Sequence, residues 1–159
     1  MSDVQDSFDC QQDEQAKKGF MSTPKNLAEV KKDIRRNIAQ YKQKKPAGQE
    51  FVIEIKGEYA GHIGMHSLNE KFEEHKGKIG YCVNKKFRGK GIATEAVKLL
   101  TKYAFKKYKL KRIEGWCRTF NKASAGVLKN AGYKLEGILR KNKKKNDKYL
   151  DDMVWAKVK

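Results

Sequence analysis

Apolar residues recur at helical spacing over residues 27–41, the clearest pattern in the first third of the chain. The members of this pattern are Leu27, Val30, Ile34, Ile38 and Tyr41. A repeat of three or four residues places side chains on one face of a helix. Asn26 and Glu29 stand at the N-cap and third helical positions of a capping box. We therefore predict a helix that begins after Asn26 and ends at residues 44–48, where Lys-Lys-Pro-Ala-Gly interrupts it.

Alternating apolar and polar residues predict antiparallel strands in the next part of the chain. Residues 51–55 and 59–68 read as a hairpin that turns at residues 56–58, and residues 78–84 read as the following strand. The period then becomes helical over residues 93–108, where one face is apolar and the other carries a row of lysines. That row is expected to be a solvated face.

The last third of the chain returns to short strands. Residues 112–117 predict a strand, and residues 121–131 predict a short helix closed by Gly132 at the C′ position. Residues 133–139 and 150–158 predict two strands that pair across a lysine-rich hairpin, residues 141–148. We expect this hairpin to be a solvated loop, with the rim of a binding site as the alternative.

These elements predict an α+β fold, with antiparallel strands first and then a strand–loop–helix–strand–helix unit that places helices on the faces of the sheet. A chain of 159 residues fits one domain with a single core, which we place at residues 21–159. Residues 1–20 are acidic, rich in Gln and poor in large apolar side chains. They predict a flexible tail or a short polar helix.

A glycine-rich segment joins the strand at residues 78–84 to the long helix. It reads Arg88-Gly89-Lys90-Gly91-Ile92-Ala93. Two glycines permit backbone conformations closed to other residues and let a ligand approach the N–H groups. The helix that follows adds unpaired N–H groups and the positive end of its dipole. The segment therefore predicts a diphosphate site, with Arg88, Lys90 and two upstream lysines as mobile charges around it.

The loop matches neither the dinucleotide-binding motif G-x-G-x-x-G nor the Walker motif G-x-x-x-x-G-K-[ST]. It is therefore not one of these two common nucleotide-binding loops. Five segments in order nevertheless resemble one family. They are Ile79-Gly80-Tyr81, the R-G-K-G-I-A loop with Thr94-Glu95-Ala96, the N-x-x-S of residues 121–124, the K-x-A-G-Y of residues 129–133 and the L-E-G-x-L-R of residues 135–140. Over residues 51–158 the chain resembles the GNAT superfamily of N-acetyltransferases, and within it the RimJ/RimL branch.

The resemblance implies a GNAT fold, a mostly antiparallel mixed sheet flanked by helices, in which a splayed strand pair holds acetyl-CoA as co-substrate. Pantetheine is expected along the backbone of Tyr81, Cys82 and Val83. The other cofactor-binding residues implied by the resemblance are Arg88, Gly89, Lys90, Gly91, Ile92, Ala93, Asn121 and Lys129. Asn121 reads equally well as a plain N-cap. One departure is clear, because no segment matches the L-R-P-like first strand that family members usually carry.

Two residues are candidates for catalysis. Ser124 resembles the hydroxyl that faces the departing thiolate in this branch, although a serine in the first turn of a helix is often only solvated. Glu114 is the nearest candidate base, because Lys78 stands where some relatives have a carboxylate. A strand glutamate beside Arg112 can equally be half of an ion pair. His62 and His66 titrate in a useful range, and a chain of waters could also accept the proton.

Charge is distributed unevenly along the chain, whose net charge is +18. Residues 76–159 contain 25 Lys or Arg and 6 Asp or Glu. Residues 1–75 contain 12 Lys or Arg and 13 Asp or Glu. A basic face attracts the phosphates of coenzyme A and could also give weak, salt-sensitive association with RNA or ribosomes. The plain alternative is a lysine-rich solvated surface.

Cysteine usage and hydropathy suggest a compartment. Cys10, Cys82 and Cys117 are odd in number and lack metal-site spacing, which indicates reduced thiols and no metal. The chain contains no run of about 18 apolar residues, which is the length that a membrane-spanning helix needs. Its acidic N-terminus is unlike a signal peptide. We therefore expect a cytoplasmic protein, either a monomer or a homodimer, that makes no contact with a membrane.

The sequence thus predicts an acetyl-CoA-dependent N-acetyltransferase in which a bound amine attacks the thioester directly. The expected acceptor is a protein N-terminal amine of the ribosomal-protein type. The first alternative is a small amine such as a polyamine or an aminoglycoside. An alternative of another class is a non-catalytic CoA-binding protein or a basic RNA-associated protein, which the missing carboxylate at Lys78 motivates.

Overall fold

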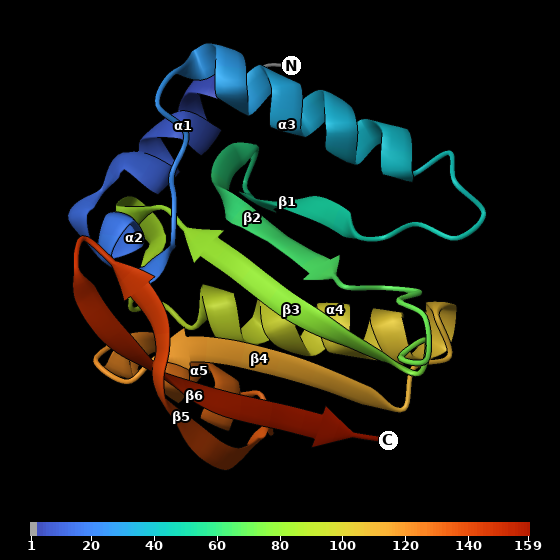
Figure 1. Ribbon diagram of the computed structural model, residues 1–159. Helices are drawn as coiled ribbons and strands as arrows, with labels where there is room; N and C mark the ends of the chain where they lie inside the picture. Colours follow the sequence, from blue (N-terminus) through green and yellow to red (C-terminus); the bar gives the residue numbers. More distant parts are fainter. Residues whose placement is uncertain (1–2) are drawn as a thin grey trace.

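The computed structural model describes residues 3–159 and shows one six-stranded sheet with helices on both faces (Figure 1). The strand order is β1-β2-β3-β4-β6-β5. The strands are β1 (Gln49–Ile55), β2 (Glu58–His66), β3 (Lys76–Val83), β4 (Arg112–Arg118), β5 (Lys134–Lys145) and β6 (Lys148–Val158). All neighbouring pairs are antiparallel except β3 and β4, which run parallel. The expected α+β fold with a mixed sheet is confirmed.

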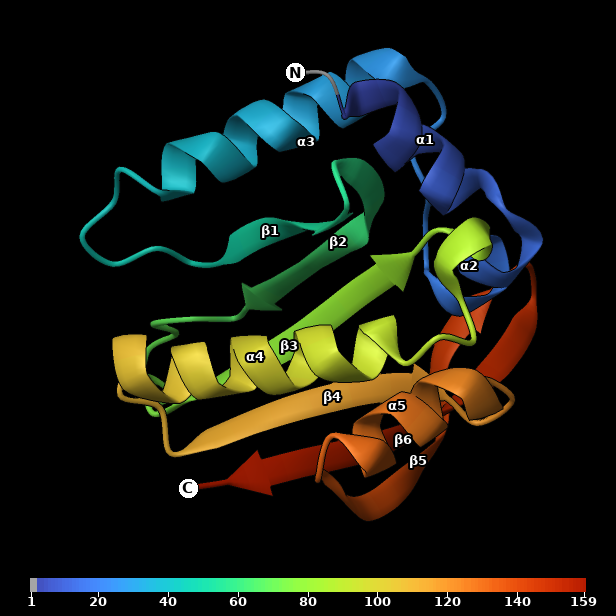
Figure 2. The same ribbon diagram turned by 180° about the vertical axis from the view of Figure 1, so that it is seen from behind.

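Helices cover the two faces of the sheet unequally (Figures 1 and 2). They are α1 (Val4–Gln12), α2 (Glu14–Gly19), α3 (Leu27–Gln40), α4 (Ile92–Lys107) and α5 (Lys122–Asn130), with a short 3₁₀ turn at Lys85–Phe87. Helix α4 packs with Ile63 and Ile79 in the main core. Cys82 points to the opposite face, where its sulfur meets Cys10 of α1. The predicted helix ends agree with these bounds to within a few residues.

Helix α3 begins as the capping pattern predicts. The Asn26 Oδ1 atom accepts from the Glu29 N–H at 3.0 Å, and the Glu29 carboxylate accepts from the Lys25 N–H at 2.8 Å. Of the apolar stripe on this helix only Val30 is fully buried, and Ile38 is 52% exposed. The helix therefore covers the β1 side of the sheet loosely.

Two hairpins close the ends of the sheet. Lys56 and Gly57 connect β1 to β2 with φ angles of 52° and 81°, and Asn146 and Asp147 connect β5 to β6 with φ angles of 47° and 59°. Positive φ at both turn positions is the geometry that fits the twist of a two-residue hairpin. The predicted turn at residues 56–58 is confirmed.

The lysine-rich hairpin differs from the expectation of a loop. Strands β5 and β6 stay paired as far as Lys145 and Lys148, with a register shift between Leu139 and Lys143. Asn and Asp tolerate positive φ, so a tight turn forms at residues 146 and 147 and the ladder continues to it. The hairpin is thus an ordered extension of the sheet beside α2 (Figure 1).

The N-terminal segment also differs from a flexible tail, because residues 4–19 form helices α1 and α2. Asp13 caps α2, since its carboxylate accepts from the N–H groups of Gln15 and Ala16. Cys10 and Ala16 are buried in a small cluster with Cys82. Burial of these side chains against the sheet stabilises a segment whose composition alone predicts no packed structure. Residues 1 and 2 of the predicted tail lie outside the described residues.

Candidate functional site

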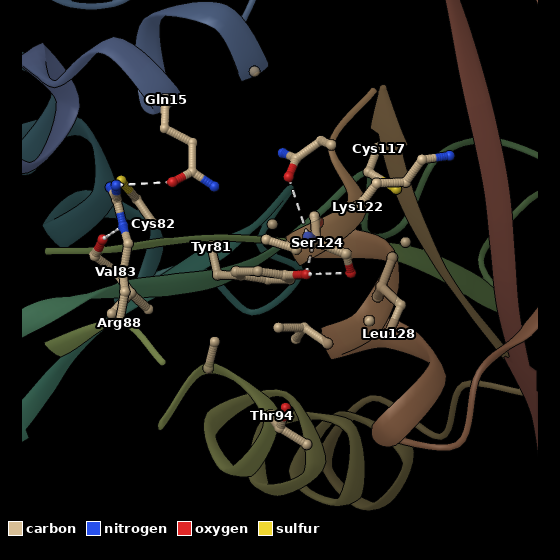
Figure 3. A pocket seen from close by; sticks show the side chains of 18 of the residues that line it. Gln15, Tyr81, Cys82, Val83, Arg88, Thr94, Cys117, Lys122, Ser124 and Leu128 are labelled. Atoms are coloured by element: carbon tan, nitrogen blue, oxygen red, sulfur yellow. Dashed lines mark hydrogen bonds between the residues drawn. The ribbon is translucent and has the colours of Figure 1, made fainter. Parts of the chain in front are cut away.

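A gap opens between β3 and β4 because their pairing stops partway. The two strands are in register from Lys76 and Arg112 to Ile79 and Gly115, and no further. Beyond that point β3 pairs with β2 alone and β4 pairs with β6 alone. A cavity of about 560 Å³ lies there, lined by both strands, the glycine-rich loop, α2 and α5 (Figure 3). The expected splayed strand pair is therefore present.

The loop at the mouth of this cavity requires its two glycines. Gly89 and Gly91 have φ angles of 74° and 77°, in the left-handed region that strains other residues. A Cβ atom at either position would meet nothing within 4 Å, so the space in front of the loop is open. Gly91 is also the N-cap of the 16-residue helix α4. The first N–H groups of α4 and the positive end of its dipole therefore mark an anion site.

Arg88 is fixed in place, contrary to the expectation of a mobile charge. Its Nε donates to the Val83 carbonyl at 2.8 Å and its Nη1 donates to the Gln15 side chain at 3.0 Å (Figure 3). Its guanidinium also pairs with Asp13. Partial burial acts to raise the pKa of Asp13, but the Arg88 guanidinium and two backbone N–H groups outweigh it and lower that pKa. Arg88 thus ties the loop to α2, so its charge is already partly neutralised.

A pair of hydroxyl groups lies on the floor of the cavity. The Tyr81 and Ser124 hydroxyl oxygens are 2.8 Å apart, and Tyr81 also donates to the Ser124 carbonyl at 3.3 Å. Burial raises the pKa of Tyr81 above its usual range, so its hydroxyl stays protonated. Asn121 caps α5, because its Oδ1 accepts from the Ser124 N–H at 3.1 Å. The N-cap role of Asn121 is present, and Asn121 lines the cavity as well.

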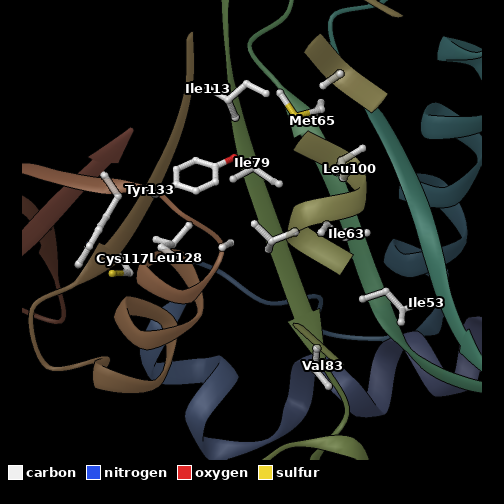
Figure 4. Packing of buried hydrophobic residues seen from close by; sticks show 14 of the residues in the cluster. Ile53, Ile63, Met65, Ile79, Val83, Leu100, Ile113, Cys117, Leu128 and Tyr133 are labelled. Carbon is white, nitrogen blue, oxygen red and sulfur yellow. The ribbon is translucent and has the colours of Figure 1, made fainter. Parts of the chain in front are cut away.

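Close packing beneath the cavity places these hydroxyls. A Cβ atom on Gly115 would lie 2.4 Å from a Leu128 methyl group, so α5 approaches β4 only because residue 115 is glycine. Leu128 itself is 1% exposed and belongs to the main core (Figure 4). Tyr133 adds a buried hydrogen bond to Thr101 at 2.7 Å. Gly132 has the positive φ, 85°, that the sequence predicts for the end of this helix.

Glu114 lies in an ion-pair network and is not among the residues that line the cavity. Its carboxylate accepts from Arg112 Nε at 2.9 Å and from Trp116 Nε1 at 3.0 Å. Partial burial acts to raise the pKa of Glu114, but Arg112 and Trp116 outweigh it and lower that pKa. A carboxylate so bound is a weak proton acceptor, which favours the ion-pair alternative; its catalytic role stays a prediction.

A second group of ionisable side chains, a Glu–His pair, lies on the face of the sheet that carries α1. His66 Nε2 lies 3.1 Å from Glu50 Oε1. A Cβ atom on Gly80, which lines the cavity, would lie 3.2 Å from the same nitrogen. Burial raises the pKa of Glu50 to about 7, and partial burial lowers the pKa of His66, whose side chain is half exposed. The cross-strand register of β1, β2 and β3 brings these residues together, and no sequence motif marks them.

The far wall of the cavity comes from α2, which the sequence did not predict as part of the site. Gln15, Ala16, Gly19 and Phe20 line it. A Cβ atom on Gly19 would be 3.6 Å from the Asn121 side chain, so α2 ends against the start of α5. The only sequence signal for this wall is Asp13, an N-cap residue followed by a short polar helix.

Known proteins share this architecture. Residues 1–134 match the family described as the acetyltransferase (GNAT) domain. The chain belongs to this family. The probable N-acetyltransferase YjcK of Bacillus subtilis (strain 168) is 49% identical over 78 residues, which are 49% of this chain and 43% of YjcK. The putative ribosomal N-acetyltransferase YdaF of the same strain is 34% identical over 93 residues, 58% of this chain and 50% of YdaF. The chain thus spans about half the length of these relatives.

A solved structure of an acetyltransferase supports the same fold. It is the microcin C7 self-immunity acetyltransferase MccE in complex with acetyl-CoA and AMP, with a TM-score of 0.75 and 25% sequence identity. The alignment covers 84% of this chain and 72% of the MccE chain. The GNAT fold expected from the sequence is therefore confirmed.

Most of the expected cofactor residues of this GNAT domain meet at the cavity between β3 and β4. Those that line it are Tyr81, Cys82, Val83, Arg88, Gly89, Gly91, Ile92, Ala93 and Asn121. Ser124, the first catalytic candidate, lines the same cavity. Lys90 and Lys129 do not line it and are exposed. Lys90 lies 5.7 Å from the Phe87 ring, at the outer side of the loop.

Within residues 3–159, no three His, Cys, Asp or Glu side chains gather in a way that could hold a metal ion. In the same part of the chain no helix combines the length and apolar character needed to cross a bilayer.

Proposed function

We propose that this GNAT protein transfers the acetyl group of acetyl-CoA to a primary amine by direct attack of the amine on the thioester. The observation that carries the proposal is the gap between β3 and β4, which opens between a glycine loop suited to phosphate and a Tyr81–Ser124 hydroxyl pair. A main-chain gap of this kind suits an extended pantetheine arm, since the unpaired backbone groups of β3 need partners.

Residues of the chain account for each part of such a cofactor. The backbone N–H groups of residues 89–93 would hold the diphosphate. The strand segment Tyr81 to Val83 would bind the pantetheine amides through main-chain groups. The acetyl group of the cofactor supplies the reactive thioester carbonyl. Cys117 and Leu128 line the part of the cavity beside the hydroxyl pair.

The hydroxyl pair suits the departure of the thiolate. Either hydroxyl can donate in the Tyr81–Ser124 hydrogen bond, which leaves the other proton for a ligand atom in the cavity. A donor placed where negative charge develops lowers the barrier mainly in the transition state. Ser124 is the donor that we propose, with Tyr81 holding its orientation.

We propose His66 over Glu114 as the proton acceptor, although neither side chain lines the cavity, because His66 is not held in an ion-pair network with an arginine as Glu114 is. His66 adjoins Gly80 at the cavity, and its lowered pKa leaves the imidazole neutral near neutral pH. We expect His66→Gln to lower kcat severalfold and to remove the acidic limb of the pH–rate profile. The exposed His75→Gln is the matched control, and an unchanged profile in His66→Gln would return the role to water or to Glu114.

Among acceptors, we propose a protein N-terminal amine. YdaF is described as a putative ribosomal N-acetyltransferase, which supports this class. The cavity is also bounded on its acceptor side by α2, next to an ordered basic hairpin that disfavours a cationic small molecule. Polyamines and aminoglycosides stay the alternative. The three free cysteines suit a reducing compartment, in line with the expected cytoplasm.

An acceptor screen tests the proposal. Peptides with different N-terminal residues, polyamines and aminoglycosides are each incubated with acetyl-CoA, and release of CoA is measured together with the mass of the acceptor. Matched peptides with a blocked N-terminus separate transfer to the α-amine from transfer to lysine. Transfer only to the small amines would overturn the acceptor class. Cofactor binding without transfer to any amine would favour the non-catalytic alternative.

A further inference from the structure

A second cavity, of about 700 Å³, lies between α2 and the β5–β6 hairpin. Four lysines line it, namely Lys17, Lys18, Lys145 and Lys148, and we call this cavity the lysine basin. Figures 1 and 2 both show α2 against the tip of the hairpin. Lys145 holds the two elements together, because its ammonium donates to the carbonyls of Lys17 and Phe20 at 2.5 Å each.

The lysine basin adjoins the cavity that holds the proposed active site. Along α2, Ala16 and Gly19 line the first cavity, whereas Lys17 and Lys18 line the basin. At the other side, Phe120 of the basin directly precedes Asn121 of the first cavity. The two cavities therefore share one wall, made of α2 and the turn before α5.

The basin collects positive charge without a carboxylate to balance it. No Asp or Glu is among its lining residues, and the ion pairs of the described residues include none made by Lys17, Lys18 or Lys148. Lysines held together on ordered elements repel one another, so an anion that enters between them is attracted. Phe120 and Met21 add apolar surface, since they are 52% and 42% exposed.

We propose that the lysine basin binds acidic residues of the acceptor polypeptide, a few positions after the amine that is acetylated. This inference rests on the proposed function. An extended chain advances about 3.3 Å per residue, so a peptide whose amine lies in the first cavity reaches past α2 within a few residues. Carboxylates of the peptide then meet Lys17, Lys18 and Lys148, and its apolar side chains meet Phe120 and Met21.

An acidic polypeptide fits the basin better than RNA does. The lining contains one aromatic ring, Phe120, whereas single-stranded nucleic acid is usually held by successive stacking rings along a charged groove. The basin is also an open hollow between α2 and the β5–β6 hairpin, which suits a short segment of side chains.

The experiment compares three peptides that share the same N-terminal residues and differ only downstream, where they carry Glu, Gln or Lys. Steady-state CoA release gives kcat and KM for each peptide with the parent protein and with a variant carrying Lys17→Glu, Lys18→Glu and Lys148→Glu. A control variant carries Lys102→Glu, Lys106→Glu and Lys107→Glu on α4, across the sheet, and has the same net charge.

We expect the parent to prefer the Glu peptide, and the basin variant to raise the KM for that peptide by roughly tenfold at low salt, since exposed ion pairs are individually weak. The kcat, the KM for acetyl-CoA and the KM for the Gln peptide should stay unchanged, as should every constant of the control variant. Added salt should reduce the difference between the parent and the basin variant in the KM for the Glu peptide.

Three results would overturn the inference. They are equal KM values for the Glu and Gln peptides in the parent, an equal loss in the control variant, or RNA binding that depends on the basin lysines without any preference for acidic peptides. If the parent acetylates no peptide, the proposed function fails by itself. Fluorescence anisotropy of the labelled Glu peptide with parent and basin variant then still tests the basin directly.

Discussion

The two walls of the first cavity are built in different ways. On the proposed cofactor side, the gap between β3 and β4 and the positive φ angles of Gly89 and Gly91 determine the shape, so the wall is mostly main chain. On the proposed acceptor side, α2 is held by side-chain contacts: Asp13 with Arg88, and Lys145 with the carbonyls of Lys17 and Phe20. The first wall depends on where glycines stand, and the second depends on a few long-range polar partners.

This difference predicts how each wall tolerates substitution. A main-chain site accepts many side chains at its strand positions but few changes at its glycines. In a wall held by side chains, substitutions can alter the contacts and the position of the helix without changing the backbone of the cofactor site. We therefore expect substitutions in the α2 wall of this protein to change acceptor binding more than cofactor binding.

Replacing Gly91 should produce the largest effect. Gly91→Val forces a branched side chain into a left-handed backbone position at the start of α4 and blocks the approach of phosphate. We expect the Kd for acetyl-CoA, measured by calorimetry, to rise by roughly 100-fold, since each hydrogen bond to a charged group contributes about 1.5–3 kcal/mol.

Gly57→Val is the matched control for this test. Gly57 has a φ of 81° and open space around its Cβ position, as Gly91 does, but it lies in the β1–β2 turn. It should lower stability by a similar amount and leave the Kd unchanged. Equal Kd values for the parent and Gly91→Val would contradict a main-chain cofactor wall.

The hydroxyl pair should show the next largest effect. Ser124→Ala removes the proposed donor to the departing thiolate, so kcat should fall by roughly 10- to 100-fold with little change in the KM for acetyl-CoA. Tyr81→Phe should give a smaller loss of kcat, because it removes the partner of Ser124 and not the donor.

Tyr133→Phe serves as the control for the hydroxyl pair. It also removes a buried tyrosine hydroxyl, the one bonded to Thr101, but in the core. It should lower the unfolding free energy by about 1 kcal/mol without changing kcat. A fall in KM and kcat together in Ser124→Ala would instead indicate ground-state strain.

Breaking the contact that holds α2 should have a smaller and selective effect. Asp13→Asn keeps an N-cap for α2 and removes the charge that pairs with Arg88. We expect the KM for the acceptor to rise about threefold to tenfold, while the KM for acetyl-CoA stays constant or falls because Arg88 is released.

Asp33→Asn tests whether any lost ion pair gives the same result, since Asp33 pairs with Arg36 on the exposed side of α3. It should leave both KM values unchanged. A larger change in the KM for acetyl-CoA than in the KM for the acceptor would show that the two walls are not separable.

The smallest expected effect is a pH-dependent change in stability on the acceptor face. Burial raises the pKa of Glu50 from 4.5 to about 7 in the folded protein, so the folded state binds the proton more tightly than the unfolded state does. The contribution of Glu50 to stability is therefore present below about pH 4.5 and is lost as the pH rises to about 7.

Glu50→Gln should thus be more stable than the parent at pH 8 by about 1–2 kcal/mol and similar to it at pH 4.5. Chemical denaturation at both values measures this. His62, whose pKa burial lowers to about 4, has the opposite dependence, but it is present in both proteins and cancels. A stability difference that does not vary with pH would show that the pKa of Glu50 is the same in the folded and unfolded states.

The cofactor wall was predictable from sequence because its signals are local. The two glycines, the strand before them and the N-cap of α5 fall within short stretches, and their geometry depends on neighbours in sequence. Helix α3 was predictable for the same reason, since Asn26 and Glu29 cap it within one turn.

The acceptor wall was not predictable because its contacts join distant residues. Cys10 is buried by Cys82, 72 positions away, and Asp13 meets Arg88, 75 positions away. The Glu50–His66 pair depends on the register of two strands, and a register shift of one residue would separate it. Composition alone therefore left a flexible tail or a short polar helix open for residues 1–20, and a solvated loop or the rim of a site open for the hairpin; it did not predict that the two segments pack together.

The gap between β3 and β4 divides the sheet into two cooperative units. Strands β1, β2 and β3 form one ladder, β4, β6 and β5 form another, and only four residue pairs, Lys76 to Ile79 with Arg112 to Gly115, join them within the sheet. Amides beside the gap should therefore exchange with solvent through partial opening at a lower free energy than those in the middle of each ladder. A ligand that bonds to both strands replaces the missing ladder. Acetyl-CoA should then slow hydrogen exchange in β3 and β4 more than in β1 or β5, and the two units should unfold together.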